Sequence, residues 1–154
     1  MTPCRLLPLI MVLVLGNIAF CDEAAKKAAD ALQGTWTTEK TIISGKELGT
    51  NEETVLVFEG EAVSWTGITR VGNSAKKSTI RFTFKLDPTK EPAAIDLIAT
   101  EGFFKGKVFP SIYSLDGDTL KICRSQPETK RPTAFVSKEG SGHWLLTLNR
   151  SKQK

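Results

Sequence analysis

The sequence has a single histidine and only three cysteines in 154 residues, and this scarcity excludes several functions. A zinc site needs several His, Cys or carboxylate ligands at suitable spacing, which one histidine and so few thiols cannot supply. Nucleophilic catalysis needs a base beside a Ser or Cys and a third group that orients the base. His143 follows a glycine-containing turn and is expected to be structural or exposed. We therefore expect no enzyme, no catalytic residue, no metal and no cofactor.

Glycine, proline and long apolar runs are also scarce. With 12 glycines and 7 prolines the chain is neither fibrous nor of low complexity, and 40% apolar residues exclude a disordered chain. The longest apolar run, residues 6–15, is too short to span a bilayer as a helix. The length indicates one domain.

The apolar run lies in a segment that is typical of a secretory signal peptide. Residues 1–5 form a short basic start, and the run follows it. Ala19 and Cys21 are small residues at the −3 and −1 positions for cleavage before Asp22. The alternative is a lipoprotein with an acylated Cys21, which Phe20 disfavours because it is bulky where lipoprotein processing expects a small residue. We predict an exported protein, periplasmic or extracellular, that is membrane-anchored only if Cys21 carries a lipid.

Cleavage would change both the cysteine content and the charge. It removes Cys4 and Cys21, so Cys123 would be the single thiol and would have no disulfide partner. It also removes Arg5 and no acid, so the formal net charge falls from +4 to +3. The basic residues occur in short, scattered pairs and not in a dense stripe with interleaved aromatics. We therefore expect no nucleic-acid partner.

Beyond an Ala-rich lead-in, apolar residues recur with a period of two, which is typical of strands with one buried face. Residues 78–86 show this best, with four apolar side chains on one face and polar side chains on the other. The dipeptide Asp116-Gly117 between two alternating runs predicts a tight hairpin, with its strands on either side. The further predicted strands, separated by turn-forming residues, are residues 36–43, 54–58, 62–70, 94–99, 107–114 and 143–150.

About eight short strands with no helix long enough for a crossover indicate an all-antiparallel sheet. Such a sheet must close into a barrel or fold into a sandwich, and sequential hairpins favour the barrel. We therefore predict an all-β fold, an antiparallel up-and-down barrel of about eight strands preceded by a signal peptide and a short N-terminal helix. The predicted segments are a signal peptide at 1–21, a short helix or flexible lead-in at 22–31, the barrel domain at 32–151 and a tail at 152–154.

Gly34-Thr35-Trp36, at the start of the first predicted strand, resembles the Gly-x-Trp motif of lipocalins and other calycins. In that superfamily the Trp closes one end of the barrel and an Arg from the last strand packs across it. The resemblance implies that Trp36 and Arg150 have these roles here.

At family level the chain resembles an uncharacterised family of exported lipocalin-like (calycin-type) domains that is abundant in planctomycete bacteria. The matching segments, in order, are residues 32–36 (LQGTW), 84–90 (FKLDPTK), 95–97 (IDL), 112–123 (IYSLDGDTLKIC) and 131–133 (RPT). The resemblance covers about residues 31–151. It implies the fold and export, and it implies no particular activity.

Aromatic residues at inward positions are the candidates for a ligand-binding interior. Trp65, Phe82, Phe84 and Tyr113 could line a pocket, or they could fill the interior of a small barrel completely. Both alternatives are open at the level of sequence.

Arg124 is the candidate polar group of that interior. Leu120 and Ile122 alternate inward, so Arg124 follows them on the inner face unless the strand has already ended. An inward charge is costly unless it is paired or lies at a wet mouth, where it could meet an anionic head group such as a carboxylate. Cys123 has the opposite parity and is expected to be buried under a neighbouring element. Asp96 is expected to point outward, so no inner carboxylate pair is predicted.

Two functions fit these features. The first is a non-enzymatic exported lipocalin-like domain that binds a small, mostly apolar ligand in the barrel, with Arg124 as its polar contact. The alternative is a filled barrel that acts as a protein–protein interaction module in the cell envelope and presents loops such as residues 125–133. The first predicts a copurifying small hydrophobic ligand. The second predicts that Lys130 and Arg131 contribute to binding an envelope protein.

Overall fold

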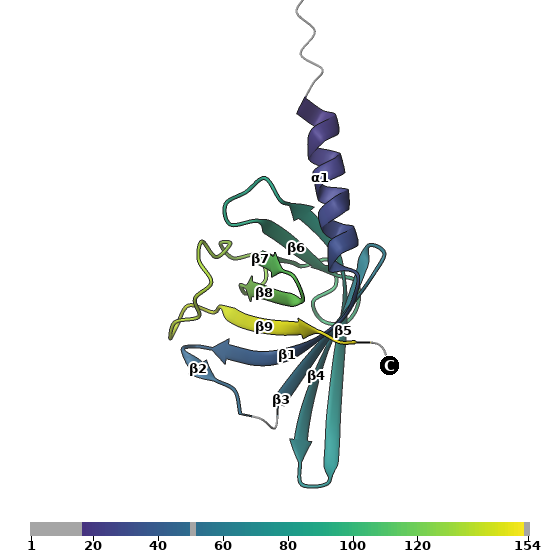
Figure 1. Ribbon diagram of the computed structural model, residues 1–154. Helices are drawn as coiled ribbons and strands as arrows, with labels where there is room; N and C mark the ends of the chain where they lie inside the picture. Colours follow the sequence, from purple (N-terminus) through teal and green to yellow (C-terminus); the bar gives the residue numbers. More distant parts are fainter. Residues whose placement is uncertain (1–16, 50–51, 153–154) are drawn as a thin grey trace, which may run out of the picture.

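Figure 1 shows the computed structural model, which describes residues 17–49 and 52–152. In that part of the chain, helix α1 (Asn17–Leu32) precedes nine strands. The strands are β1 (Gly34–Ile43), β2 (Lys46–Glu47), β3 (Glu52–Glu59), β4 (Ala62–Val71), β5 (Ser74–Asp87), β6 (Ala94–Ala99), β7 (Val108–Asp116), β8 (Thr119–Arg124) and β9 (Trp144–Arg150). Residues 1–16 of the predicted signal peptide lie outside the described residues. None of the described helices is long and apolar enough to cross a membrane.

The strands form one closed antiparallel barrel. The order around the wall is β1-β3-β4-β5-β6-β7-β8-β9, and β9 pairs with β1 to close it. The short β2 pairs with the end of β1 and stays outside the ring. Closure leaves no free edge among the eight wall strands. The predicted all-β up-and-down barrel of about eight strands is confirmed.

The predicted strands are correct in position, and most of them are shorter than the observed ones. Residues 94–99 coincide with β6, whereas β5 begins four residues before the predicted 78–86. The first residues of β5 pair with β4 and not with β6, so this hairpin extends past the neighbouring wall (Figure 1). The two-residue β2 was not predicted, because so short a strand has no period to detect.

The inner faces of the strands form a single hydrophobic core. On β5, Phe82 and Phe84 are buried, while Thr83 and Lys85 between and beyond them are exposed. On β1 the pairing with β9 shifts between Thr38 and Lys40. This β-bulge adds one residue to β1, so the inward parity changes along the strand. The other fully buried large side chains of the core are Leu32, Trp36, Leu56, Val63, Ile95, Leu97, Leu120, Ile122, Leu146 and Leu148.

The two ends of the barrel differ. We call the end that carries α1 the closed end. We call the other end, where strands β1, β4, β6 and β8 terminate, the open end. Figure 1 shows α1 at the top and the β4–β5 hairpin at the bottom, on opposite sides of the barrel.

Trp36 and Arg150 cover the core at the closed end. Trp36 is fully buried, and its Nε1 donates a hydrogen bond to the carbonyl oxygen of Leu32 at 2.8 Å. The guanidinium carbon of Arg150 lies 4.1 Å from the centroid of the Trp36 ring. Its Nη1 and Nη2 donate to the carbonyl oxygens of Gln33 at 2.6 Å and Ala31 at 2.8 Å. Arg150 therefore packs across Trp36, as the resemblance implied, and also satisfies carbonyls where α1 ends.

Arg150→Met should lower the free energy of unfolding by about 2–3 kcal/mol, because it removes charge-assisted hydrogen bonds and a cation–π contact together. Urea denaturation followed by tryptophan fluorescence measures the change. The control is Arg81→Met, because Arg81 pairs with Glu101 on the exposed surface and its loss should cost less than about 1 kcal/mol. Equal losses in the two variants would contradict the closing role of Arg150.

Candidate functional site

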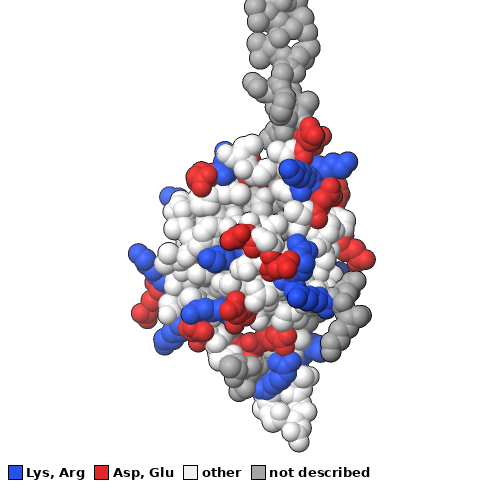
Figure 2. All heavy atoms as spheres, viewed as in Figure 1, with Lys and Arg blue, Asp and Glu red and all other residues white. Residues whose placement is uncertain are grey.

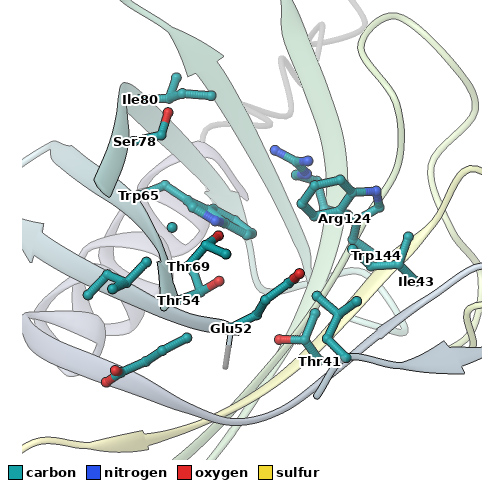
Figure 3. Close-up of a pocket in the computed structure, with 14 residues that line it drawn as sticks. Thr41, Ile43, Glu52, Thr54, Trp65, Thr69, Ser78, Ile80, Arg124 and Trp144 are labelled. Carbon is teal, nitrogen blue, oxygen red and sulfur yellow. The ribbon is translucent and has the colours of Figure 1, made fainter. Parts of the chain in front are cut away.

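The barrel interior is filled toward the closed end and hollow toward the open end. A cavity of about 260 Å³ lies there, shown in Figure 3. Six wall strands contribute to it: β1, β3, β4, β5, β8 and β9. Its lining residues are Thr41, Ile43, Leu48, Glu52, Glu53, Thr54, Trp65, Gly67, Ile68, Thr69, Ser78, Ile80, Arg124 and Trp144.

Small side chains at inward positions create the space. On β4 the inward residues after Trp65 are Gly67 and Thr69, which follow it at intervals of two. A Cβ atom placed on Gly67 would meet only the carbonyl oxygen of Ser78, at 4.0 Å. On β1 the bulge turns Thr41 inward, and its side chain is short. The cavity therefore exists because a glycine and short hydroxyl side chains occupy positions that large residues occupy elsewhere in the barrel.

Some of the surface charges form ion pairs with their neighbours. On the face shown in Figure 2, Lys and Arg side chains alternate with Asp and Glu and do not gather into a patch of one sign. Several pairs are close, with the Lys107 and Glu128 charged atoms 2.6 Å apart and the same distance between those of Arg70 and Glu53. The positive charge of Arg124, inside the barrel, has no such ion-pair partner among the described residues.

Arg124 lies in the cavity with aromatic rings around it and no hydrogen-bond partner among the described residues. Its guanidinium carbon is 4.5 Å from the ring centroid of Trp144, 4.8 Å from that of Trp65 and 4.9 Å from that of Phe109. Only 9% of the residue is exposed, and its buried Nε has no partner in the described structure. Burial lowers the pKa of Arg124 to about 10, so the guanidinium still carries its charge at neutral pH.

Two acidic residues stand at the mouth of the cavity. Glu52 precedes Thr54 by two residues, so it shares the inward face of β3. Figure 3 shows the Glu52 side chain beside Thr54 and pointing toward Arg124 and Trp144, but no ion pair joins it to Arg124 in the described structure. The carboxylate of Glu53 is held by Arg70 at 2.6 Å.

The predicted ligand-binding residues divide into two groups. Trp65 and Arg124 line the cavity, and Arg124 is on the inner face as predicted. Phe82, Phe84 and Tyr113 are buried but do not line this cavity, so their assignment to a ligand site stays a prediction. Their side chains belong to the filled part of the core.

The contacts of the aromatic rings explain why Phe82 and Phe84 do not line the cavity. Phe82 packs edge-on between Trp65 and Phe109, with ring centroids 6.4 and 5.5 Å apart. Phe84 packs edge-on against Phe58, with centroids 5.3 Å apart. An inward aromatic residue lines a cavity only where its neighbours across the barrel leave room, and these neighbours do not.

Trp144 and Gly67 are site residues that the sequence reasoning missed. Trp144 lies directly opposite Arg124 in the pairing of β8 with β9. A signal was present, because Trp144 shares its parity with Leu146 and Leu148. The signal for Gly67 was a glycine at an inward position of a predicted strand, which often marks a close approach or a space.

Arg131, which the interaction-module hypothesis names, is half-buried and contacts the barrel wall. Its Nη1 donates to the carbonyl oxygens of Ser111 at 2.6 Å and Ile95 at 3.1 Å. Its Nη2 lies 2.6 Å from the Asp96 carboxylate, which points outward as predicted. Arg131 therefore attaches the connection between β8 and β9 to the outer wall of the barrel.

The side chains of Cys123 and His143, the remaining residues with reactive groups, contact a backbone carbonyl oxygen. Cys123 is buried, as predicted, with its Sγ 3.7 Å from the carbonyl oxygen of Val136, and burial raises the pKa of its thiol. The Nδ1 of His143 lies 3.4 Å from the same carbonyl oxygen. Within residues 17–49 and 52–152, no three His, Cys, Asp or Glu side chains cluster as metal ligands would.

Comparison of the chain with protein-family models, with curated proteins and with solved structures finds no match. Inferences about function therefore depend on the geometry of the site.

Arg124→Met should leave the free energy of unfolding unchanged or raise it by about 1 kcal/mol, because a buried charge without a hydrogen-bonding partner opposes folding more than its ring contacts favour it. Urea denaturation of both proteins at neutral pH measures this. Folding lowers the pKa of Arg124, so its opposition to folding is complete below about pH 10 and is relieved as the pH rises further.

The matched control is Arg131→Met, which removes a guanidinium that has three acceptors within 3.1 Å. This variant should lose about 2 kcal/mol. A comparable loss in Arg124→Met would show that Arg124 is a structural residue.

Proposed function

We propose that this protein is a non-enzymatic, exported, lipocalin-like barrel that binds a small, mostly apolar ligand in the cavity at its open end. One observation carries the proposal: a cavity of about 260 Å³ remains between Trp65 and Trp144 in a barrel whose interior is otherwise packed. Apolar walls with a few convergent polar groups are the usual composition of a small-molecule site. Aliphatic side chains such as Ile43 and Ile80 complete the apolar wall.

A binding role is favoured over catalysis by the chemistry of the cavity. Its described lining holds hydroxyls, two carboxylates and one guanidinium, but no histidine or thiol. The lining places no histidine or thiol beside the hydroxyls of Thr41, Thr54 and Ser78 to form a nucleophile–base pair of the usual kind. The lining can hold and orient a ligand.

Export and membership of the lipocalin-like family are parts of the same proposal. Export is supported by the signal-peptide pattern of residues 1–21. Family membership is supported by the Gly-x-Trp segment and by the packing of Arg150 across Trp36.

Native mass spectrometry of the protein purified from its own envelope fraction should show a reproducible extra mass that is lost on denaturation. A bare mass would contradict the proposal. It would favour the alternative, a barrel without ligand that binds an envelope protein through a surface such as residues 125–133. The same spectrum reports whether Cys21 is present and acylated.

Gly67→Leu should reduce the fraction of protein that carries the extra mass at least tenfold, because the new side chain would enter the cavity from β4. The variant should fold, since glycine within a strand costs about 0.5–1 kcal/mol and the backbone there suits any residue. Thr66→Leu is the control. It adds similar bulk to the opposite face of the same strand, where the Thr66 hydroxyl meets that of Thr79. Equal occupancy in the two variants would place the ligand outside the cavity.

A further inference from the structure

The charge inside the cavity carries information about the ligand beyond its apolar character. Arg124 is nine-tenths buried, and none of its N–H groups has a hydrogen-bond acceptor among the described residues. The other buried or half-buried arginines differ. Arg131 and Arg150 each donate to backbone carbonyls and to a carboxylate. A guanidinium offers five N–H donors, and leaving a fully buried one such as the Nε–H of Arg124 unmet is costly.

The three rings around Arg124 favour its charge but cannot accept its hydrogen bonds as an oxygen would. Trp65, Trp144 and Phe109 place their ring centroids between 4.5 and 4.9 Å from the guanidinium carbon. These ring contacts stabilise the positive charge of Arg124 and hold its side chain in place. A group with two oxygen acceptors in one plane matches the guanidinium best, and a carboxylate is such a group.

The charge distribution favours a ligand with one negative charge. Arg124 is the single cation among the described residues that line the cavity. Glu52 and Glu53 lie at the mouth, and the charge of Glu53 is already compensated by Arg70. Glu52 would repel a second negative charge that projected toward the mouth. A polyanion such as a phosphate monoester is therefore disfavoured.

The size of the cavity favours a compact ligand. Its volume of about 260 Å³ is below the range of about 300–1,000 Å³ that is usual for drug-sized ligands. A cavity of about 150 Å³ holds benzene, which has six carbon atoms. In proportion, this cavity accommodates about ten non-hydrogen atoms, which is one ring with a short side chain and not a long acyl chain.

We propose that the ligand is a compact monocarboxylate, an aryl or short branched aliphatic acid of about ten non-hydrogen atoms, whose carboxylate accepts hydrogen bonds from Arg124. Its apolar body packs against Trp65 and Ile80, which are neighbours on the wall, and the short side chains at Gly67 and Thr41 leave room for it. This inference rests on the proposed function, because it names the chemical class of the ligand in the same cavity.

The test compares an acid with its uncharged counterpart of the same shape. The probes are 3-phenylpropionate and 3-phenylpropionamide, and isothermal titration calorimetry on the full chain measures both affinities. We expect the acid to bind at least tenfold more tightly than the amide. Hexadecanoate, a monocarboxylate with a long chain, should bind more weakly than 3-phenylpropionate.

Three variants assign the discrimination to particular side chains. Arg124→Met should abolish the difference between acid and amide by weakening the acid. Arg81→Met, which changes an exposed arginine outside the cavity, should leave both affinities unchanged. Glu52→Gln should tighten the acid two- to threefold and leave the amide unchanged, because it removes a negative charge at the mouth.

The possible failures separate this inference from the proposed function. Equal affinities of acid and amide in the unmodified protein, abolished for both by Gly67→Leu, would overturn charge recognition and leave the cavity as a binding site. Tighter binding of hexadecanoate would overturn the limit on size. No binding of either phenyl probe at millimolar concentration would overturn the inference, and the proposed function would then depend on the native mass spectrum.

Discussion

The pairing of β9 with β1 is the constraint on which the rest of the molecule depends. A sheet with one apolar face cannot remain flat in water, and this pairing converts it into a barrel whose apolar face is enclosed. Trp36 and Arg150 are partners in the same pairing, so the contact that covers the core forms where the sheet closes. Arg150 also binds carbonyls near the end of α1, which joins the helix to the closed end. Strand closure, core coverage and helix attachment are therefore one cooperative unit.

The bulge in β1 separates the packed half of the interior from the hollow half. Without it, the alternation that buries Trp36 would turn Lys40 inward, and the cavity would contain a second cation. The shift instead places Thr41 in the wall of the cavity and leaves Lys40 outside, where its ammonium lies 2.6 Å from the Glu47 carboxylate. Two strands away, on β4, Gly67 contributes no side chain. Both features remove bulk from the open end, and neither weakens the closed end.

Among the buried and half-buried arginines, Arg124 is the one whose position is least explained by a contribution to the stability of the fold. Arg131 and Arg150 have carbonyl and carboxylate acceptors, and each attaches a segment to the barrel. Arg124 has three aromatic rings and an open space beside it. Buried charges in proteins are ordinarily paired, and an unpaired one in a cavity is typical of a site whose partner arrives from outside. The cavity and the charge together make the open end the functional end in our proposal.

The sequence by itself determined the strands and their inward faces, because alternation and turn chemistry are local properties. The paired roles of Trp36 and Arg150 came from the resemblance to lipocalins and not from these local patterns. The inward position of Arg124 followed from the same alternation. Only the tertiary structure decided which inward residues border empty space: Phe82 is inward but meets other rings, whereas Trp65 borders the cavity. The β1 bulge and the attachment of Arg131 are equally beyond local patterns. A cavity depends on side chains from six strands that meet across the barrel, and no single strand carries that information.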